Sequence, residues 1–269
     1  MRGREGEPPP APEALPVEVV DAHCHLDIMG GSVADAVAAA QAVGVRRVVT
    51  IGVDVLTSQW SADAAAAHPD VYAGVAIHPN EAYHATDEAL DEIARLARLP
   101  RVRAVGETGL DYYRDTATPE QQQHSFRRHI AIAKESGKAL VIHDRDAHDD
   151  VLRILLEEGA PARTVFHCYS GDAAMARVCA GQGYYLSFAG TVTFKNAQNL
   201  RDAVAVTPLD LLLVETDAPF LTPTPHRGAP NAPYLIPLTV RAMADAAAVP
   251  LEQLCAAIAA NSERVFGPW

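Results

Sequence analysis

Short apolar segments alternate with helical segments eight times between residues 17 and 247, and this alternation constrains the fold more than any other feature of the sequence. The apolar segments are rich in Val, Ile and Leu, as expected of parallel strands that are covered on both faces. Eight successive βα units predict a closed (β/α)8 TIM barrel, and an open doubly wound sheet is the alternative. The expected strands are residues 17–20, 45–51, 71–77, 102–106, 139–142, 164–166, 184–188 and 210–214.

The helical segments carry recognisable start and stop signals. Ser32 is a candidate N-cap, and residues 118–121 (TPEQ) read as a capping box with proline at the first helical position. The expected helices cover residues 32–43, 57–67, 86–99, 118–136, 146–158, 172–180, 196–206, 235–247 and 251–260. We expect a flexible tail over residues 1–16, which are rich in Pro, Glu and Gly, and a single barrel domain over residues 17–269.

Composition narrows the range of functions. The formal net charge of −12 argues against broad, non-specific attraction to nucleic acid or anionic membranes, although it leaves room for a local cationic site. We expect no membrane span, because no apolar run reaches about 18 residues, and no signal peptide. The four cysteines show no CxxC spacing, so we interpret them as reduced thiols of a cytoplasmic protein.

Six side chains that can bind a metal ion lie at the carboxyl ends of expected strands. His23 and His25 follow the first strand and are two residues apart, so they project together while Cys24 is turned away. The carboxyl ends of barrel strands converge on one face, where active sites are built. A single histidine at a strand end is more often structural, but four histidines and two carboxylates together predict a metal centre. The six residues are His23, His25, Glu107, His143, His167 and Asp217.

The ligand set contains nitrogen and oxygen but no cysteine. Such a set suits Zn²⁺, Mn²⁺, Fe²⁺ or Mg²⁺ with open coordination positions, and it disfavours a closed structural zinc site. Six ligands exceed what one tetrahedral ion needs, so we expect two divalent ions about 3.5–4 Å apart, with Glu107 as the bridging carboxylate. Such a pair lowers the pKa of a bound water and holds the attacking and leaving oxygens of a phosphoryl displacement.

Five motifs occur in order along the chain, at residues 21–27 (DAHCHLD), 106–113 (GETGLDYY), 141–143 (VIH), 167–171 (HCYSG) and 215–221 (ETDAPFL). Together they resemble those of the TatD-like metal-dependent deoxyribonuclease family, which belongs to the amidohydrolase superfamily. The similarity extends from about residue 18 to residue 267. The resemblance implies a TIM barrel, divalent metal ions and phosphodiester hydrolysis, often exonucleolytic on DNA. It also implies that the six residues named above are the ligands.

Three positions depart from the usual pattern of that family. Asp144 follows His143 where Ser or Thr is usual, and its negative charge could repel phosphate or bind a further cation. Ala232 replaces a usual glutamate before Pro233, and Ala76 replaces a usual glycine. None of these changes removes a proposed ligand, so they bear on the choice of substrate more than on metal binding.

Further roles follow from side-chain chemistry. Asp217 is the candidate general base, because it could orient or deprotonate a metal-bound water, and its alternative role is that of a ligand only. His78 could line the pocket or be structural, and Arg227 could contact a phosphate or be an exposed loop residue. Tyr112 and Tyr113 could stack on a nucleotide base or pack over the mouth of the barrel.

The sequence therefore predicts a cytoplasmic metal-dependent hydrolase, and we expect a DNase in which a divalent metal activates water to attack a DNA or nucleotide phosphodiester. The alternative is a hydrolase of the same fold acting on an ester or amide, such as an aminoacyl ester of RNA, because the same ligands would serve it. The complete ligand set disfavours a catalytically silent metal-binding protein. We expect neither a stable protein partner nor a sequence-specific DNA-binding module, since no helix-turn-helix, zinc-finger spacing or basic stripe is present.

Overall fold

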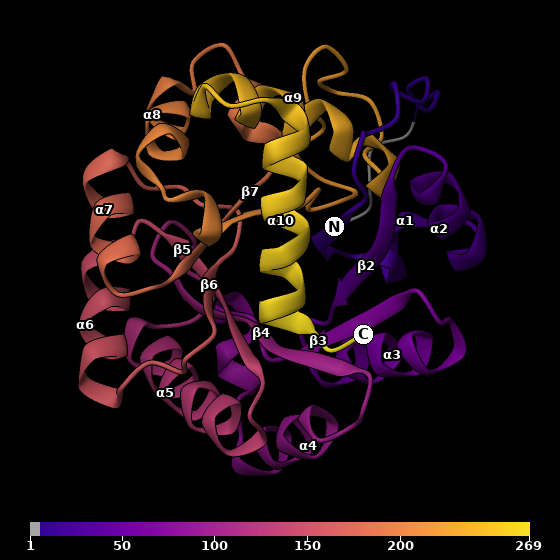
Figure 1. Ribbon diagram of the computed structural model, residues 1–269. Coiled ribbons are helices and arrows are strands. Elements are labelled where there is room, and N and C mark those ends of the chain that lie inside the picture. Colours follow the sequence, from indigo (N-terminus) through magenta and orange to yellow (C-terminus); the bar gives the residue numbers. More distant parts are fainter. Residues whose placement is uncertain (1–5) are drawn as a thin grey trace. The chain divides into compact units, whose positions relative to one another are not determined.

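The computed structural model describes residues 6–269 and contains eight strands in the sheet order β1 to β8, interleaved with helices (Figure 1). This strand order is that of a (β/α)8 barrel, so the predicted fold class is confirmed. The chain divides into two compact units. We call Met1–Val49 with Cys168–Trp269 the terminal unit, and Thr50–His167 the central unit.

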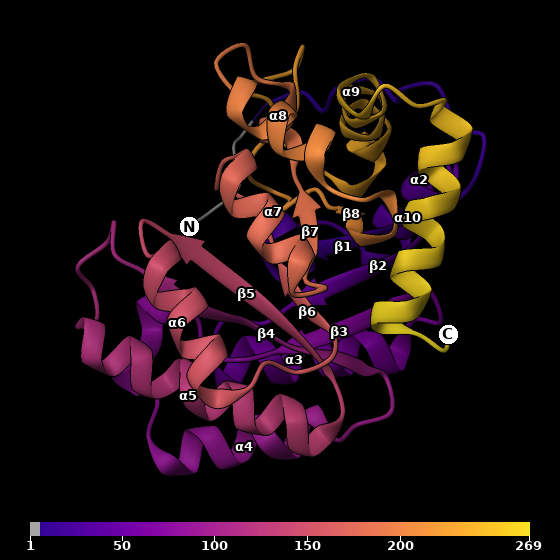
Figure 2. The same cartoon turned by 60° about the vertical axis from the view of Figure 1, so that its left-hand side comes forward.

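The central unit contains four strands that pair in parallel in chain order, and Figure 2 shows β4 and β5 side by side. Helix α3 packs against β3, and α5 packs against β4 and β5. The strands are β3 (Val71–Val75), β4 (Val102–Asp111), β5 (Ala139–Arg145) and β6 (Thr164–Phe166). The helices are α3 (Val55–Ala67), α4 (Asp87–Ala97), α5 (Pro119–Ser136), α6 (His148–Glu158) and the 3-10 helix η1 (Pro79–His84).

The helix signals in this unit are confirmed. Thr118 Oγ1 accepts a hydrogen bond from the Gln121 backbone N–H, and the Gln121 side chain accepts one from the Thr118 N–H, which completes the predicted capping box. Gly137 ends α5 in the left-handed region, with φ of 63°. The apolar stripe of α4, formed by Leu90, Ile93, Leu96 and Ala97, is fully buried. Local capping and one buried stripe per helix therefore account for these elements.

Strand β4 is longer than predicted, because its pairing with β5 continues beyond Gly106. Val105 pairs with Leu140, but the next partners are Thr108 and Ile142, so β4 carries one extra residue between the two pairs. Such a bulge bends a strand and redirects a side chain. It lies at Gly106 and Glu107. The prediction that Glu107 follows the strand was therefore wrong, since Glu107 lies within β4 at this bulge. The same correction applies to His143, which lies within β5, and to His23, which lies within β1 (Val19–Cys24).

Gly109 allows β4 and β5 to approach each other at the site. It pairs with His143, and its φ of 135° lies in a region that residues with a side chain rarely adopt. A Cβ atom added to Gly109 would lie 2.1 Å from the His143 carbonyl oxygen. Only glycine fits here, so the close pairing that carries His143 depends on it.

The terminal unit contains β1 (Val19–Cys24), most of β2 (Val45–Ile51), β7 (Tyr185–Phe188) and β8 (Leu212–Val214). Strands β7 and β8 pair in parallel, and the long helix α10 packs against β1 and β8. Ser32 caps the helix that it was predicted to begin. The helices of this unit are α1 (Leu26–Met29), α2 (Val33–Gln41), α7 (Ala173–Gly181), α8 (Gln198–Val206), α9 (Ile236–Ala247), α10 (Leu251–Phe266) and the 3-10 helices η2 (Gly190–Thr193), η3 (Leu209–Leu211) and η4 (Pro233–Leu235).

Part of the predicted flexible tail is packed against the terminal unit. Residues 1–5 of that tail lie outside the described residues. Beyond them, Pro9 and Leu15 are buried. The Tyr234 hydroxyl donates a hydrogen bond to the Pro9 carbonyl at 2.6 Å, and the Leu15 N–H donates one to the Val43 carbonyl at 3.0 Å. Buried apolar side chains and backbone hydrogen bonds therefore hold residues 9–15 in place.

Two further sequence expectations concern the membrane and the cysteines. Among residues 6–269, no single helix is both long and apolar enough to cross a membrane, and α9 and α10 reach that length only as a pair bent by 110°. All four cysteines are free thiols.

Candidate metal centre

One oxygen atom of Glu107 is shared by three imidazoles of the central unit. Glu107 Oε1 lies 2.8 Å from His143 Nδ1, 2.9 Å from His167 Nε2 and 3.3 Å from His78 Nε2. The Glu107 side chain is buried, with 4% of the residue exposed. The central unit therefore brings three predicted ligands together, two from within β4 and β5 and one from directly after β6. It adds His78, which the sequence had suggested only as a pocket-lining residue.

The surroundings of this cluster keep Glu107 ionised. Burial by itself would raise the pKa of Glu107, but the nearby imidazoles of His167 and His78 and the hydrogen bond from His143 hold that pKa well below its usual value. The pKa of His143 shifts in the opposite direction. Burial would lower its pKa, but hydrogen bonds to Asp111 and Glu107 outweigh burial and raise it. The pKa of His78 is lowered, chiefly by burial.

Asp111 is a site residue that the sequence analysis did not identify. Its Oδ2 accepts a hydrogen bond from His143 Nε2 at 3.1 Å and one from the Asn80 side-chain amide at 3.2 Å. Its Oδ1 accepts the backbone N–H groups of Tyr113 and Arg114, both at 3.1 Å. Asp111 thus fixes the ring of His143 and the turn that follows β4. The sequence could have indicated Asp111, because it is an acidic residue four positions after Glu107 in the motif GETGLDYY.

The central cluster fits a divalent cation. Both ring nitrogens of His143 face carboxylate oxygens, which requires either a protonated ring or a cation bound between the ring and one carboxylate. His78, Glu107 and His143 offer ligand atoms that all lie within 4.8 Å of one another. Imidazole nitrogen and carboxylate oxygen are typical ligands of zinc, manganese and iron. A ligating histidine held by a second carboxylate, as His143 is by Asp111, is also common at such sites.

The remaining predicted ligands form a second cluster in the terminal unit. Asp217 Oδ1 lies 3.5 Å from His25 Nε2 and 3.8 Å from His23 Nε2. The two imidazole rings meet edge to face, with their centroids 5.1 Å apart. The Cys24 thiol donates instead to the Val49 carbonyl. The prediction that the two histidines project together, with the cysteine turned away, is confirmed.

Hydrogen bonds within the terminal unit join the ends of β1 and β8 and position this cluster. The Asp217 N–H donates to the His23 carbonyl at 2.9 Å, and the His25 N–H donates to the Ala218 carbonyl at 2.7 Å. Asp217 has a φ of 54°, in the left-handed region that Asp and Asn tolerate better than most residues. These contacts orient the Asp217 carboxylate toward both imidazoles.

Asp21 is a second residue that sequence analysis missed. Its Oδ1 accepts the backbone N–H groups of Thr216 at 2.9 Å and His23 at 3.2 Å, and its Oδ2 accepts the Thr216 hydroxyl at 2.5 Å. Burial raises the pKa of Asp21 to about 7, although the Thr216 hydrogen bonds act in the opposite direction. One buried carboxyl therefore links the backbone beside His23 to the backbone beside Asp217.

The family model described as TatD related DNase matches residues 20–267 of this chain. The chain belongs to this family. It is 47% identical over 258 residues to the "Uncharacterized metal-dependent hydrolase TatD" of Mycobacterium tuberculosis, a match that covers 93% of this chain and 98% of the relative. It is 38% identical over 257 residues to the "Uncharacterized metal-dependent hydrolase YcfH" of Escherichia coli, covering 92% and 95% of the two chains.

A solved structure also resembles this chain. The crystal structure of YJJV, a TatD homologue from Escherichia coli, superposes with a TM-score of 0.88 at 27% identity, covering 93% of this chain and 98% of that one. Membership of the TatD family, together with the nitrogen and oxygen ligand clusters, identifies a metal-dependent hydrolase.

Two of the predicted substrate contacts in this TatD chain have structural partners. The Tyr112 hydroxyl donates to Asp150 at 2.8 Å and accepts a hydrogen bond from the Gln123 amide, so it anchors the turn after β4. Arg227 is exposed, and its guanidinium lies 4.0 Å from the centroid of the Phe194 ring. Neither contact tests a role in binding substrate, which stays a prediction for both residues.

Asp144, the residue that departs from the usual TatD pattern, faces a histidine. Its Oδ2 lies 2.7 Å from His148 Nδ1, in the first turn of α6. The hydrogen bond to Asp144 raises the pKa of His148. The added negative charge beside His143 is therefore partly balanced within the same segment of the chain.

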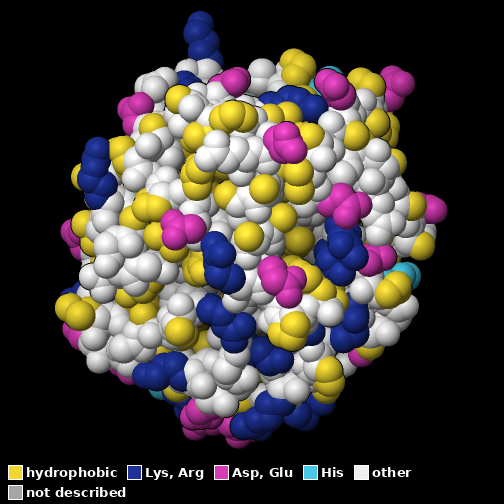
Figure 3. Space-filling model, viewed as in Figure 1, with side chains coloured by type: hydrophobic (Ala, Val, Ile, Leu, Met, Phe, Trp, Pro, Cys, Tyr) yellow, Lys and Arg dark blue, Asp and Glu magenta, His cyan; other side chains and the backbone are white. Residues whose placement is uncertain are grey.

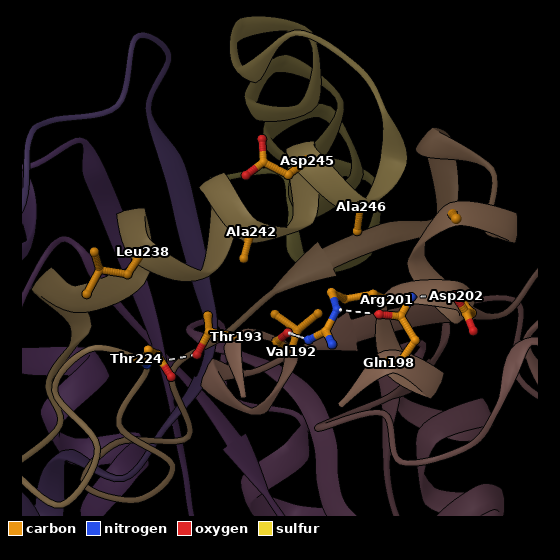
Figure 4. A pocket seen from close by; sticks show the side chains of 11 residues that line it. Val192, Thr193, Gln198, Arg201, Asp202, Thr224, Leu238, Ala242, Asp245 and Ala246 are labelled. Carbon is orange, nitrogen blue, oxygen red and sulfur yellow. Dashed lines mark hydrogen bonds between the residues drawn. The ribbon is translucent and has the colours of Figure 1, made fainter. Parts of the chain in front are cut away.

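A surface pocket of about 490 Å³ lies in the terminal unit, apart from the proposed ligands of the TatD motifs (Figure 4). It is lined by residues of η2, α8 and α9, together with Thr224. Arg201 is one of the lining residues and donates to the carbonyls of Val192 and Phe194, so this guanidinium holds the η2 loop in place. The lining contains neither histidine nor cysteine, and we do not assign the metal centre to it.

The segment between β3 and His78 is held by a buried histidine of α5. His129 Nε2 accepts a hydrogen bond from the Ile77 N–H at 3.0 Å, and its Nδ1 donates to the Ser125 carbonyl at 2.7 Å. Burial lowers the pKa of His129 to about 4. Its neutral form is therefore part of the native structure.

We expect His129 to make the protein sensitive to acid. The unfolded chain binds a proton on this ring below pH 6.5, whereas the folded protein resists protonation until about pH 4. The contribution of neutral His129 to the free energy of unfolding is complete above pH 6.5. It is lost as the pH falls toward 4, by about 3 kcal/mol in all. The free energy of unfolding of wild type and of His129→Gln would be measured in urea. We expect the difference between them to narrow as the pH falls from 6.5 to 4.

The exposed His124 in the same helix provides the control for this measurement. His124→Gln should keep the acid dependence of the wild type. A gap between wild type and His129→Gln that stays constant from pH 7 to pH 4 would contradict the role given to His129.

Proposed function

We propose that His23, His25, Glu107, His143, His167 and Asp217 hold two divalent ions and that the protein hydrolyses phosphodiester bonds of DNA. The observation that carries this proposal is the buried Glu107 carboxylate, one oxygen of which meets three imidazoles. In a (β/α)8 barrel the active site is built toward the carboxyl ends of the strands, and the six residues lie in the carboxyl-terminal halves of their strands or shortly after them. The TatD related DNase family supports the choice of reaction.

The side chains would divide the chemistry between them. When bound, the divalent ions lower the pKa of a water molecule and neutralise charge that develops on the phosphate. Glu107 would supply a buried carboxylate ligand for the ions, and Asp111 holds the His143 ring in a fixed orientation. Asp217 acts as the general base and accepts a proton from the attacking water. Arg227 provides a cation for a substrate phosphate.

The charges of the protein favour a local site for DNA over a broad basic surface. The chain carries a net charge of −12, and on the face drawn in Figure 3 Lys and Arg side chains lie among Asp and Glu side chains. A surface of this kind gives little non-specific affinity for a phosphate backbone. We therefore propose that DNA is bound near the metal ions and by few phosphate contacts. The free cysteines support a cytoplasmic location.

A substrate screen tests the proposed function. The wild-type protein would be assayed with Zn²⁺, Mn²⁺ or Mg²⁺ on single-stranded DNA labelled at either end, duplex DNA, RNA, and small carboxylic esters and amides. We expect stepwise shortening of DNA that stops when a chelator is added. Hydrolysis of carboxylic esters or amides alone, with no cleavage of any phosphodiester, would overturn the proposal in favour of the alternative with the same fold.

A further inference from the structure

An exposed tyrosine and an arginine meet at the carboxyl ends of β4 and β5. Tyr113 lies just after β4 and is 65% exposed, although it is a large aromatic residue. The guanidinium carbon of Arg145, the last residue of β5, lies 3.8 Å from the centroid of the Tyr113 ring. Arginine stacked on an aromatic ring presents a flat surface with a positive charge at its edge.

The pairing of β4 with β5 brings these two residues together beside the central cluster. Asp111 pairs in register with Arg145, and the Tyr112 N–H donates to the Arg145 carbonyl at 2.9 Å. Arg145 lies two residues after His143 on the same strand, so both side chains leave β5 on the same side. The tyrosine and the arginine therefore lie close to a proposed ligand, within one unit of the protein.

Asp111 couples the tyrosine turn to the central cluster. One of its oxygens accepts the Tyr113 N–H, and the other accepts a hydrogen bond from His143. The turn is further held by Tyr112, whose hydroxyl donates to Asp150 on α6. The backbone of Tyr113 is thus tied to His143 through Asp111, and the Tyr113 ring lies against the Arg145 guanidinium.

The guanidinium of Arg145 is available to an anionic ligand. Within residues 6–269, Arg145 takes part in no ion pair, and three carboxylates of the neighbouring segments pair with other residues. Asp111 faces His143, Asp144 faces His148, and Asp150 faces Arg153. A phosphate approaching the exposed tyrosine ring would meet an arginine that has no competing carboxylate partner.

We infer that Tyr113 and Arg145 form a platform for an unpaired nucleobase and its phosphate, and that this platform selects single-stranded nucleic acid. The inference rests on the proposed function and specifies its substrate. An aromatic face accepts any unstacked base, whereas the bases of a duplex are already stacked on one another. Small phosphodiesters without a base gain nothing from such a platform.

Kinetics on two substrates test the platform. For wild type and Tyr113→Ala, kcat/KM would be measured on an eight-nucleotide single strand and on a small dialkyl phosphodiester that has no aromatic ring. We expect the ratio of the two values, strand over small ester, to fall roughly 5- to 100-fold in the variant, mainly through KM. Tyr113→Phe should keep the wild-type ratio, because the ring is retained, and Arg145→Ala should lower it.

Tyr83 supplies a matched control, because it is another exposed tyrosine of the central unit, with 47% exposure, and its hydroxyl donates a hydrogen bond to Glu81. Tyr83→Ala should leave the ratio at the wild-type value. Tyr113→Ala should lower kcat/KM less on duplex DNA than on the single strand. The same comparison on single strands of DNA and of RNA shows which of the two nucleic acids the platform serves. An equal effect on duplex and single strand would overturn the claimed selectivity.

The platform and the proposed function can fail separately. If the wild type cleaves single strands and Tyr113→Ala, Tyr113→Leu and Arg145→Ala all keep its ratio, the platform is wrong and the proposed function stands. If the wild type cleaves no phosphodiester, the proposed function is wrong. The platform is then tested by binding of a fluorescent single strand in the presence of chelator. Wild-type binding no tighter than that of folded Tyr113→Ala would then overturn it as well.

Discussion

Replacing Glu107 with alanine is expected to lower phosphodiester hydrolysis by roughly 10³-fold or more and to reduce the amount of bound metal. This carboxylate is the point at which His78, His143 and His167 meet. Without it, three imidazoles would surround a space that lacks the negative charge a divalent ion needs. Metal content by elemental analysis and kcat/KM on a small phosphodiester would be measured on the same preparation.

Two further variants complete this experiment. Glu107→Gln keeps the shape of the side chain and removes its charge, so it should resemble the alanine variant in activity. Glu135→Ala removes an exposed glutamate near the end of α5 and should match the wild type. Full activity with normal metal content in Glu107→Ala would show that the bridging assignment is wrong.

Asp217→Asn is expected to retain most of the metal while losing roughly 10²–10⁴ in turnover, because the amide cannot accept the proton of the attacking water. The substitution suits the backbone, since Asn tolerates the left-handed φ of 54° found at this position. Its amide oxygen remains able to contact an ion. A parallel measurement of metal content and kcat separates loss of the base from loss of a ligand.

Asp210→Asn is the control for this change, because Asp210 is an exposed aspartate shortly before β8. It should behave as the wild type in both measurements. Wild-type turnover in Asp217→Asn would show that the general base is another residue. Loss of metal together with activity would show that Asp217 acts as a metal ligand only.

The fold was predictable because each of its parts is encoded locally. A short apolar run predicts a buried strand wherever it occurs, and the Thr118 capping box fixes the start of α5 through contacts within four residues. The residues at which strands end were less predictable. Strand β4 runs on to Asp111 because its backbone continues to pair with β5, and the bulge at Glu107 depends on that partner.

The ligands were predictable for a different reason, which is that metal-binding side chains recur at strand ends. The residues that orient them were not. Asp111 reaches His143 across 32 positions, Asp21 reaches Thr216 across 195, and His129 reaches Ile77 across 52. Each contact depends on how strands and helices are packed, and no local pattern marks it. The burial of Leu15 in the predicted tail depends likewise on a partner, Val43, elsewhere in the chain.

Anomalous diffraction from crystals of the manganese- or zinc-loaded protein would test most directly whether the strand-end residues hold metal ions. We expect two peaks about 3.5–4 Å apart, with a Glu107 oxygen about 2.0–2.2 Å from each and with His143 and Asp217 among the ligands. Peaks ligated by other residues, or a metal-loaded protein with no peak beside Glu107, would contradict this expectation.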